Sequence, residues 1–199
     1  MRPQAPRRLV ILTEGELGPH SAKTAFGIIR YGRDEVVAVL DSANAGRNVA
    51  EWLPGHDIPV VATLDEALAV PGRSRPDTLV IGIAPTGGRL PDAWHAVLHD
   101  AIDAGLELHS GLHTFLGDDP ELSSAAAIAG VRIVDYRRPP ERYETAVGRP
   151  HGPGKRVILT VGTDCAIGKM SVALELRNAG RAAGDELTIF SRDRVWRRA

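Results

Sequence analysis

The segment VGTDCAIGKMS, residues 161–171, has the residue types of a phosphate-binding loop. In the general pattern G-x-x-x-x-G-K-[ST], glycines let backbone amides turn toward a phosphate, and a lysine adds a positive charge. Here an apolar run comes before the loop, and an Ala/Leu-rich stretch of helical character follows it. We therefore predict that a phosphate-bearing cofactor binds to Gly162, Thr163, Asp164, Cys165, Ala166, Ile167, Gly168, Lys169, Met170 and Ser171.

One position of this loop departs from the general pattern. Met170 stands where a Ser or Thr hydroxyl normally binds Mg²⁺, and Ser171 is displaced by one residue, which rotates it about 100° around a helix. Phosphate binding survives this change, because it depends on backbone amides and on Lys169. Metal-assisted phosphoryl transfer does not follow, and we predict no metal site. Only three of the 24 Lys and Arg residues are lysines, which favours a specific role for Lys169.

Three further side chains are candidates for chemistry. Cys165 lies in the loop near a lysine and a helix N-terminus, where the pKa of a thiol falls, so it is either a nucleophile or a small residue in a tight turn. His109 and His113 border a loop at the expected ligand-binding edge of a sheet. Each is either a general base or a structural residue.

Short, β-branched apolar runs alternate with longer helical patterns, which predicts an α/β fold. The runs are nearly continuous in apolar character, as in parallel strands that are covered on both faces. No G-x-G-x-x-G sequence follows the first strand, which disfavours a dinucleotide-dependent dehydrogenase. The predicted strands are 8–12, 35–41, 58–62, 78–84, 106–110, 131–135 and 156–162, and the predicted helices are 21–32, 63–70, 90–105, 118–130 and 168–184. Ligand-binding loops are expected at 13–25, 84–91 and 109–120.

A composition break separates two parts of the chain. Residues 147–156, VGRPHGPGKR, combine Gly, Pro and Arg without periodicity, as linkers do. We predict a Rossmann-like, doubly wound N-terminal domain at 1–148, followed by the first part of a P-loop-like α/β domain at 149–199. The second domain would have few partners for its apolar faces, and such faces favour association, so a homo-oligomer is among the expected states.

Composition excludes several classes of protein. The formal net charge of −1 argues against a partner that is nucleic acid or a membrane surface. The single cysteine fits a reducing compartment. The apolar run LVIL, residues 9–12, is too short for a signal peptide, and no stretch reaches the roughly 20 residues of a membrane span. We expect a cytoplasmic protein that acts on a small molecule.

Three motifs together resemble a known family. They are VGTDCAIGKMSVALEL (161–176), GLHTFLGDDPEL (111–122) and VRIVDYRRPP (131–140). Together they resemble the DgcN type of D-glutamate N-acetyltransferase, a family long known only as a domain of unknown function. The resemblance extends from residue 8 to about residue 180, and the methionine that follows Gly-Lys belongs to the family's loop.

The resemblance implies a fold and a reaction. It implies a Rossmann-like half joined to a P-loop-like half, and transfer of an acetyl group from acetyl-CoA to the amino group of D-glutamate or a related D-amino acid. Family members are longer, so the chain is expected to be a truncated member that need not be active. Two alternatives stay open: an ATP- and Mg²⁺-binding P-loop protein, and a non-catalytic Rossmann-like fragment.

Overall fold

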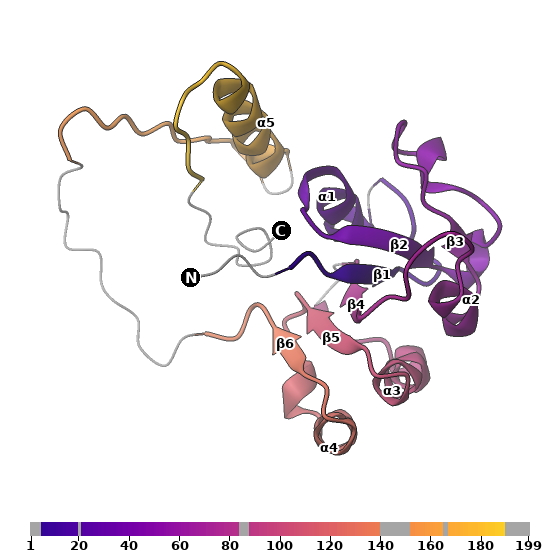
Figure 1. Ribbon diagram of the computed structural model, residues 1–199. Helices are drawn as coiled ribbons and strands as arrows, with labels where there is room; N and C mark the ends of the chain where they lie inside the picture. The colour runs from indigo at the N-terminus through magenta and orange to yellow at the C-terminus, as the bar shows by residue number, and fades with distance from the viewer. Residues whose placement is uncertain (1–4, 20, 84–87, 140–151, 165–166, 190–199) are drawn as a thin grey trace. The chain divides into compact units, whose positions relative to one another are not determined.

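The computed structural model describes the chain except for residues 1–4, 20, 84–87, 140–151, 165–166 and 190–199. The described chain divides into two compact units, the first ending at Arg138 and the second beginning at Pro139 (Figure 1). The first unit is a parallel sheet with helices, and the second contains one long helix.

The first unit is built on six parallel strands in the order β3-β2-β1-β4-β5-β6. This order is that of a Rossmann-type doubly wound sheet, in which the direction of winding reverses between β1 and β4. The predicted α/β, Rossmann-like fold class is confirmed. The strands are β1 (Arg8–Leu12), β2 (Glu35–Leu40), β3 (Val60–Val61), β4 (Thr78–Ile81), β5 (Glu107–Ser110) and β6 (Ile133–Asp135).

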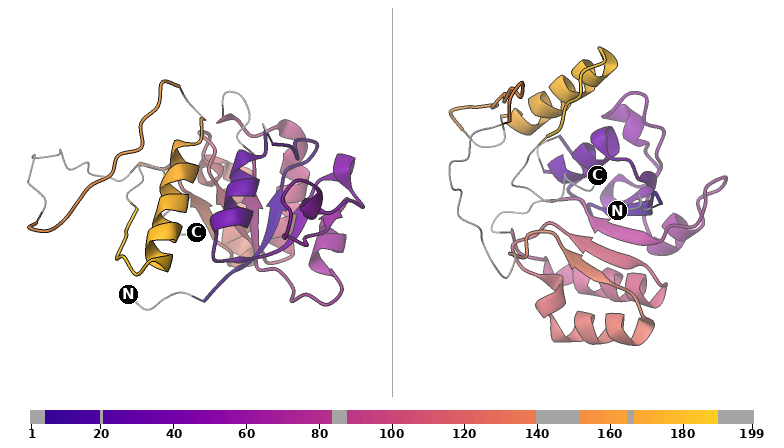
Figure 2. Two further views of the ribbon diagram at one scale, coloured as in Figure 1. Left: turned by 90° about the horizontal axis from the view of Figure 1, so that it is seen from above. Right: turned by 60° about the vertical axis from the view of Figure 1, so that its left-hand side comes forward.

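Helices cover the two faces of this sheet unequally. Helix α1 lies on one face, whereas α2, α3 and α4 lie together on the other (Figures 1 and 2). The handedness of the crossovers requires this, because β1–α1–β2 winds in one direction along the sheet and β4–α3–β5–α4–β6 winds in the other. The helices are α1 (Lys23–Tyr31), α2 (Leu64–Leu68), α3 (His95–Asp103) and α4 (Pro120–Ala129).

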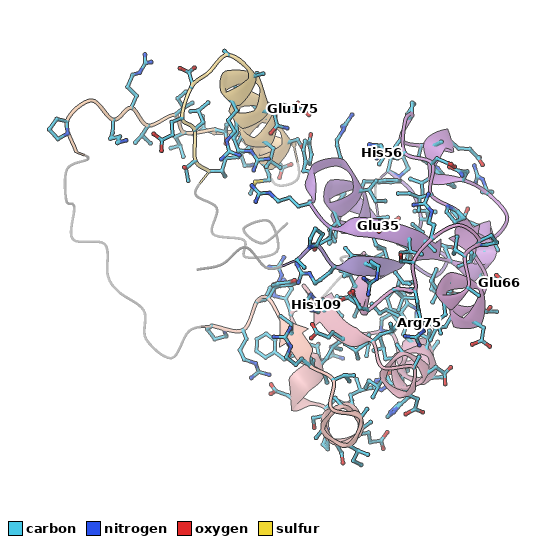
Figure 3. All side chains as sticks on the ribbon, viewed as in Figure 1. Glu35, His56, Glu66, Arg75, His109 and Glu175 are labelled. Carbon is cyan, nitrogen blue, oxygen red and sulfur yellow. The ribbon has the colours of Figure 1, made fainter. Side chains whose placement is uncertain are left out.

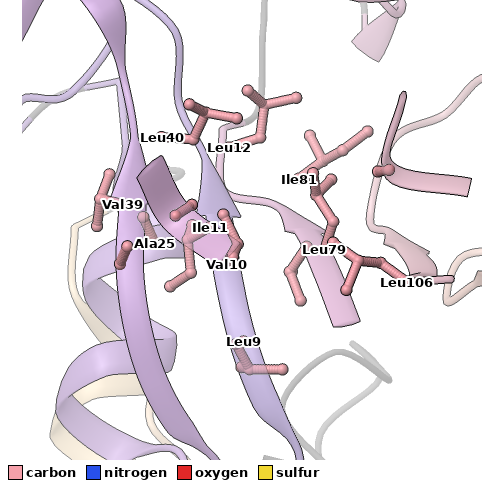
Figure 4. Close-up of a cluster of buried hydrophobic side chains, with 14 of the residues drawn as sticks. Leu9, Val10, Ile11, Leu12, Ala25, Val39, Leu40, Leu79, Ile81 and Leu106 are labelled. Carbon is pink, nitrogen blue, oxygen red and sulfur yellow. The ribbon is translucent and has the colours of Figure 1, made fainter. Parts of the chain in front are cut away.

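The core lies between the central strands and these helices (Figure 4). All four residues of β4 are buried, as are the last four of β1 and the last five of β2. Ile11 and Leu79 are fully buried, which stabilises the fold by about 1.5–3 kcal/mol for each such side chain. By contrast, β3 and β6 lie at the sheet edges and are only partly buried.

Sequence signals at helix ends have the expected effect. The Asp119 carboxylate accepts hydrogen bonds from the amides of Glu121 and Leu122 at 2.9 and 3.0 Å, and Pro120 occupies the first turn of α4. Gly130 ends the same helix in the left-handed conformation, with φ of 70°. These are the N-cap and C-cap interactions typical of Asp and Gly at the two ends of a helix.

The second unit departs from the prediction at its first element. Its helix, α5 (Lys169–Ala182), forms as expected, but residues 156–162 form no strand. A strand is stable only when neighbours accept its backbone hydrogen bonds, and no other strand lies in the described part of this unit. Its apolar side chains are consequently exposed, at 64% for Val157, 72% for Ile158, 78% for Leu159 and 76% for Val161.

The predicted domain boundary near residue 150 lies in residues 140–151, outside the described part of the chain, and stays a prediction.

Candidate functional site

The carboxyl ends of all six strands meet at one edge of the sheet, because the strands are parallel. In open α/β sheets, ligands bind at this edge where the winding reverses, which here lies between β1 and β4. The loops that follow β1, β4 and β5 therefore form the candidate ligand region of the first unit. The structure gives these loops different roles.

The corner between β1 and β2 is filled by the protein's own hydrogen bonds. Asp41, directly after β2, is completely buried. One of its carboxylate oxygens accepts from the Thr13 hydroxyl at 2.9 Å and from the Leu17 amide at 3.0 Å. The other accepts from the amide and the side-chain nitrogen of Asn44 at 3.1 and 3.0 Å. These four donors match the roughly four acceptor positions of a carboxylate.

Glu14 closes the same corner from outside. Its carboxylate accepts from the backbone amide of Ser42 at 3.1 Å and from the Ser42 hydroxyl. In dinucleotide-binding Rossmann folds, an acidic residue after the second strand instead binds a ribose hydroxyl. Asp41 has no acceptor position left for such a ligand. The corner therefore holds the β1 loop against the β2 loop.

His109 is buried in a polar cluster on β5 (Figure 3). Its Nδ1 lies 2.7 Å from the Tyr136 hydroxyl and 3.2 Å from Nη1 of Arg7, and its Nε2 lies 3.3 Å from the Glu107 carboxylate. An arginine can only donate, so Nδ1 is an acceptor and Nε2 carries the hydrogen.

Burial and the nearby Arg7 charge lower the pKa of His109, which favours the neutral ring. Burial opposes ionisation of Glu107, but hydrogen bonds from Arg132 and His109 lower the pKa of its carboxyl group. Both ring nitrogens of His109 thus have protein partners, which favours the structural interpretation of this residue over a general base.

His113 lies in the loop after β5 and is exposed, unlike His109. Its backbone amide donates to the Gly88 carbonyl at 3.0 Å, which joins the loops after β4 and β5. Residues 84–87 of the predicted ligand-binding loop 84–91 lie outside the described residues.

Two of the sequence motifs fold against each other and hold this loop. The Asp135 carboxylate accepts from the amides of Leu116 and Gly117 at 2.9 and 3.0 Å. The Arg138 guanidinium pairs with Asp118 at 2.7 Å and lies 4.6 Å from the centre of the Phe115 ring. Segments 111–122 and 131–138 therefore act as one structural unit.

The glycine–lysine loop of the second unit leads directly into α5. Gly168 has a left-handed conformation, with φ of 93°, and the helix begins at Lys169. The Lys169 ammonium donates to the Asp164 carbonyl of the same loop. Met170 is not the only departure from the general pattern, because five residues separate Gly162 from Gly168 and the pattern has four, so the loop is a longer variant of it. Cys165 and Ala166 lie outside the described residues.

This arrangement suits an anion. The first amides of a helix lack intrahelical acceptors, and the helix dipole adds partial positive charge there. Met170 is the residue directly after Lys169 in the first turn of α5, so no hydroxyl is present at the usual Mg²⁺ position. The Ser171 hydroxyl belongs to the next position of the helix. Within the described residues, no three His, Cys, Asp or Glu side chains gather into a metal site.

Comparison with known families identifies both units. Residues 42–139 match the Rossmann-like domain of unknown function DUF1611_N, and residues 144–193 match the P-loop domain DUF1611_C. The chain belongs to the DUF1611 family. Its P-loop-like second unit is thereby shown at the level of the family, although the preceding strand is absent here.

Two relatives carry a functional name. A protein of Tritonibacter scottomollicae named D-glutamate N-acetyltransferase is 36% identical over 168 residues, which are 84% of this chain and 46% of that protein. One of the same name from a Pseudoalteromonas species is 39% identical over 102 residues, 51% of this chain and 30% of that protein.

A solved structure supports the same relationship. The crystal structure of a DUF1611 family protein from Anabaena variabilis has a TM-score of 0.77 and 37% identity, covering 89% of this chain and 51% of that one. The chain thus spans about half the length of its relatives or less. No helix among the described residues is both long and apolar enough for a transmembrane segment.

The Asp41 network yields a first prediction. Asp41→Asn places an amide donor against one pair of existing donors, so we expect the free energy of unfolding to fall by about 2–4 kcal/mol. Urea denaturation followed by circular dichroism measures it. Asp103→Asn, at an exposed position at the end of α3, is the control and should change stability little. Equal losses for the two variants would show that the network does not stabilise the corner.

The cluster around His109 yields a second prediction. The folded-state pKa of His109 is lowered from its ordinary 6.5, so the unfolded chain binds more protons below that pH. The free energy of unfolding should therefore be lower at pH 5.5 than at pH 7.5. His109→Gln should lose part of this pH dependence, whereas His56→Gln should keep it. An unchanged pH dependence in His109→Gln would contradict the burial of a neutral imidazole.

Proposed function

We propose that the chain binds acetyl-CoA through the loop of its second unit, for transfer of the acetyl group to the amino group of D-glutamate or a related D-amino acid. In this reaction the thioester C–S bond breaks and an amide C–N bond forms. The substrate ammonium gives a proton to a base, and CoA leaves as the thiol. The names of the two relatives support this substrate class.

The observation that carries the cofactor proposal is the start of α5. The amides of Lys169, Met170 and Ser171 belong to the first turn of a 14-residue helix, and the Lys169 ammonium donates to the Asp164 carbonyl in the loop before it. A CoA phosphate would take the place of the Asp164 carbonyl as the acceptor of that ammonium. Phosphates bind at helix N-termini through just these donors.

An ATP-binding P-loop protein is the second candidate, favoured by the family's description as a P-loop domain. Mg²⁺ in such proteins is held by the Ser or Thr that follows the lysine. Met170 has no oxygen for this purpose. We therefore favour a ligand whose phosphates bind without a metal, as those of CoA do.

A binding experiment tests the cofactor proposal. In calorimetry without Mg²⁺, the chain should bind CoA, and Lys169→Ala should weaken that binding about 10- to 100-fold, because a charge-assisted hydrogen bond is lost. Lys155→Ala changes another lysine of the same unit and should leave the affinity unchanged. If Lys169→Ala bound CoA as tightly as the wild type, the assignment of the loop to CoA phosphates would be wrong.

Two further measurements separate the alternatives. Met170→Ser supplies the missing hydroxyl, and its affinity for ATP with Mg²⁺ is compared with that of the wild type. If the wild type binds ATP in a Mg²⁺-dependent manner and Met170→Ser binds it no more tightly, the ATP-binding alternative is favoured. Acetyl-CoA incubated with D-glutamate should release free thiol and yield N-acetyl-D-glutamate. CoA binding without this product would favour a non-catalytic fragment.

A further inference from the structure

We propose that the junction between the loops after β4 and β5 binds a carboxylate of the acceptor amino acid, through Arg89 and His113. The proposal rests on the proposed function in one respect, the choice of D-glutamate as the acceptor. The junction itself is defined by Gly88, Arg89, His113 and Thr114.

The position of the junction favours a ligand. Gly88 follows β4 and His113 follows β5, so both lie at the carboxyl edge of the sheet, next to the point where the winding reverses. On the other side of that point, the Asp41 network fills the corner between β1 and β2. The β4–β5 side, in contrast, has the exposed side chains of Arg89 and His113.

The backbone fixes His113 tightly against Gly88. The Gly88 carbonyl accepts from the amides of His113 and Thr114 at 3.0 and 3.2 Å. A Cβ atom built on Gly88 would lie 2.8 Å from Cβ and 2.9 Å from Cγ of His113, so the imidazole packs directly on the glycine. Gly88 also has a φ of 65°, which other residues rarely adopt. Only glycine suits this contact.

The ends of the His113 loop are held independently of Gly88. The Ser110 hydroxyl accepts from the Leu112 amide at 3.1 Å, and Nε of Arg137 donates to the Gly111 carbonyl at 2.5 Å. Asp135 holds the far end through the amides of Leu116 and Gly117. His113 and Thr114 are exposed in the middle of a segment whose backbone is fixed on both sides. Such preorganisation lowers the entropic cost of binding a ligand.

The polar side-chain groups of Arg89 and His113 are not paired with other polar groups among the described residues of the first unit. Arg89 is exposed, and neither its guanidinium nor the His113 ring has a hydrogen bond or ion pair with any described residue. Arg33 shares this property, but it precedes β2 and lies at the opposite edge of the sheet. The other described arginines of the unit contact a carboxylate, a carbonyl or an aromatic ring, namely Arg7, Arg8, Arg30, Arg47, Arg73, Arg75, Arg132, Arg137 and Arg138.

Arg89 follows Gly88 directly in the chain, and the His113 ring packs on Gly88, so a guanidinium and an imidazole both belong to this junction. These two groups are donors that suit a carboxylate. Arginine binds carboxylates through two parallel hydrogen bonds, and an imidazole N–H adds a third donor. D-glutamate carries two carboxylates, so one can bind here without involving its amino group in the contact. A cationic or apolar amino acid side chain gains nothing from these donors.

Calorimetry on the full 199-residue chain with D-glutamate tests the proposal. The wild type should bind D-glutamate. Arg89→Gln should weaken binding about tenfold or more, and His113→Asn should also weaken it. Arg33→Gln removes an equally exposed arginine from the opposite edge and should bind as the wild type does. Wild-type affinity in Arg89→Gln and His113→Asn, or no binding of D-glutamate to the wild type, would overturn the proposal.

A second variant and a second ligand make the result decisive. Gly88→Ala displaces the His113 ring without removing a charge, so it should weaken D-glutamate binding while circular dichroism confirms that it folds. CoA binding is measured on the same preparations. If CoA binds but the junction variants keep their D-glutamate affinity, this proposal fails and the proposed function stands. If CoA does not bind but Arg89→Gln loses D-glutamate, the junction stands and the cofactor assignment fails.

Discussion

Hydrogen bonding between neighbouring strands is the constraint on which both units of this protein depend. In the first unit, six parallel strands pair their backbone hydrogen-bonding groups with one another, so continuous apolar runs can be buried on both faces of the sheet. In the second unit, the run at 156–162 has similar apolar character but no neighbouring strand among the described residues, and its side chains are exposed. Similar local sequences thus end in different structures because their surroundings differ.

The parallel arrangement also decides where chemistry is placed. It brings every strand's carboxyl end to one edge, and the structure then divides that edge into two parts. On the β1–β2 side, Asp41 joins two loops and is saturated by its donors. On the β4–β5 side, hydrogen bonds hold the segment around His113 at both ends, and Arg89 and His113 are exposed. Rigid backbone with unused polar groups is what a binding site needs.

In the account proposed here, the two units recognise different kinds of anion. The second unit offers the backbone amides at the start of α5 together with the Lys169 ammonium, a combination suited to phosphate. The first unit offers side-chain donors at the junction of two loops, suited to a carboxylate. An acetyl transfer from acetyl-CoA to D-glutamate requires one site of each kind. The family models match a Rossmann-like domain and a P-loop domain in these two parts of the chain.

The sequence predicted those parts of the fold that depend on local pattern. Strands β1, β2 and β4 and the helix caps at Asp119 and Gly130 follow from apolar runs and capping residues. The edge strand β3 is shorter than predicted, because pairing on one side orders fewer residues. For 156–162, the pattern was right for a strand, but pairing depends on residues elsewhere in the protein.

The sequence alone did not predict the long-range polar contacts. The Thr13 hydroxyl and Asp41 are 28 residues apart, and Arg7 and His109 are 102 apart, so no spacing rule connects them. For this reason His109 and His113 look alike in the sequence, although one is buried between protein partners and the other is exposed. Arg89 was missed because its lack of an internal partner is visible only when the other arginines have been placed. The glycine–lysine loop was found because its residues are contiguous.

The most direct test is to map both ligands on one ¹⁵N-labelled sample by NMR. CoA should shift the amide signals of Lys169, Met170 and Ser171, and D-glutamate should shift those of Gly88, Arg89 and His113, while Leu17 and Asn44 stay unchanged. Shifts from either ligand centred on Leu17 and Asn44 would show that the Asp41 corner opens to bind it, and would contradict the division of the sheet edge described above.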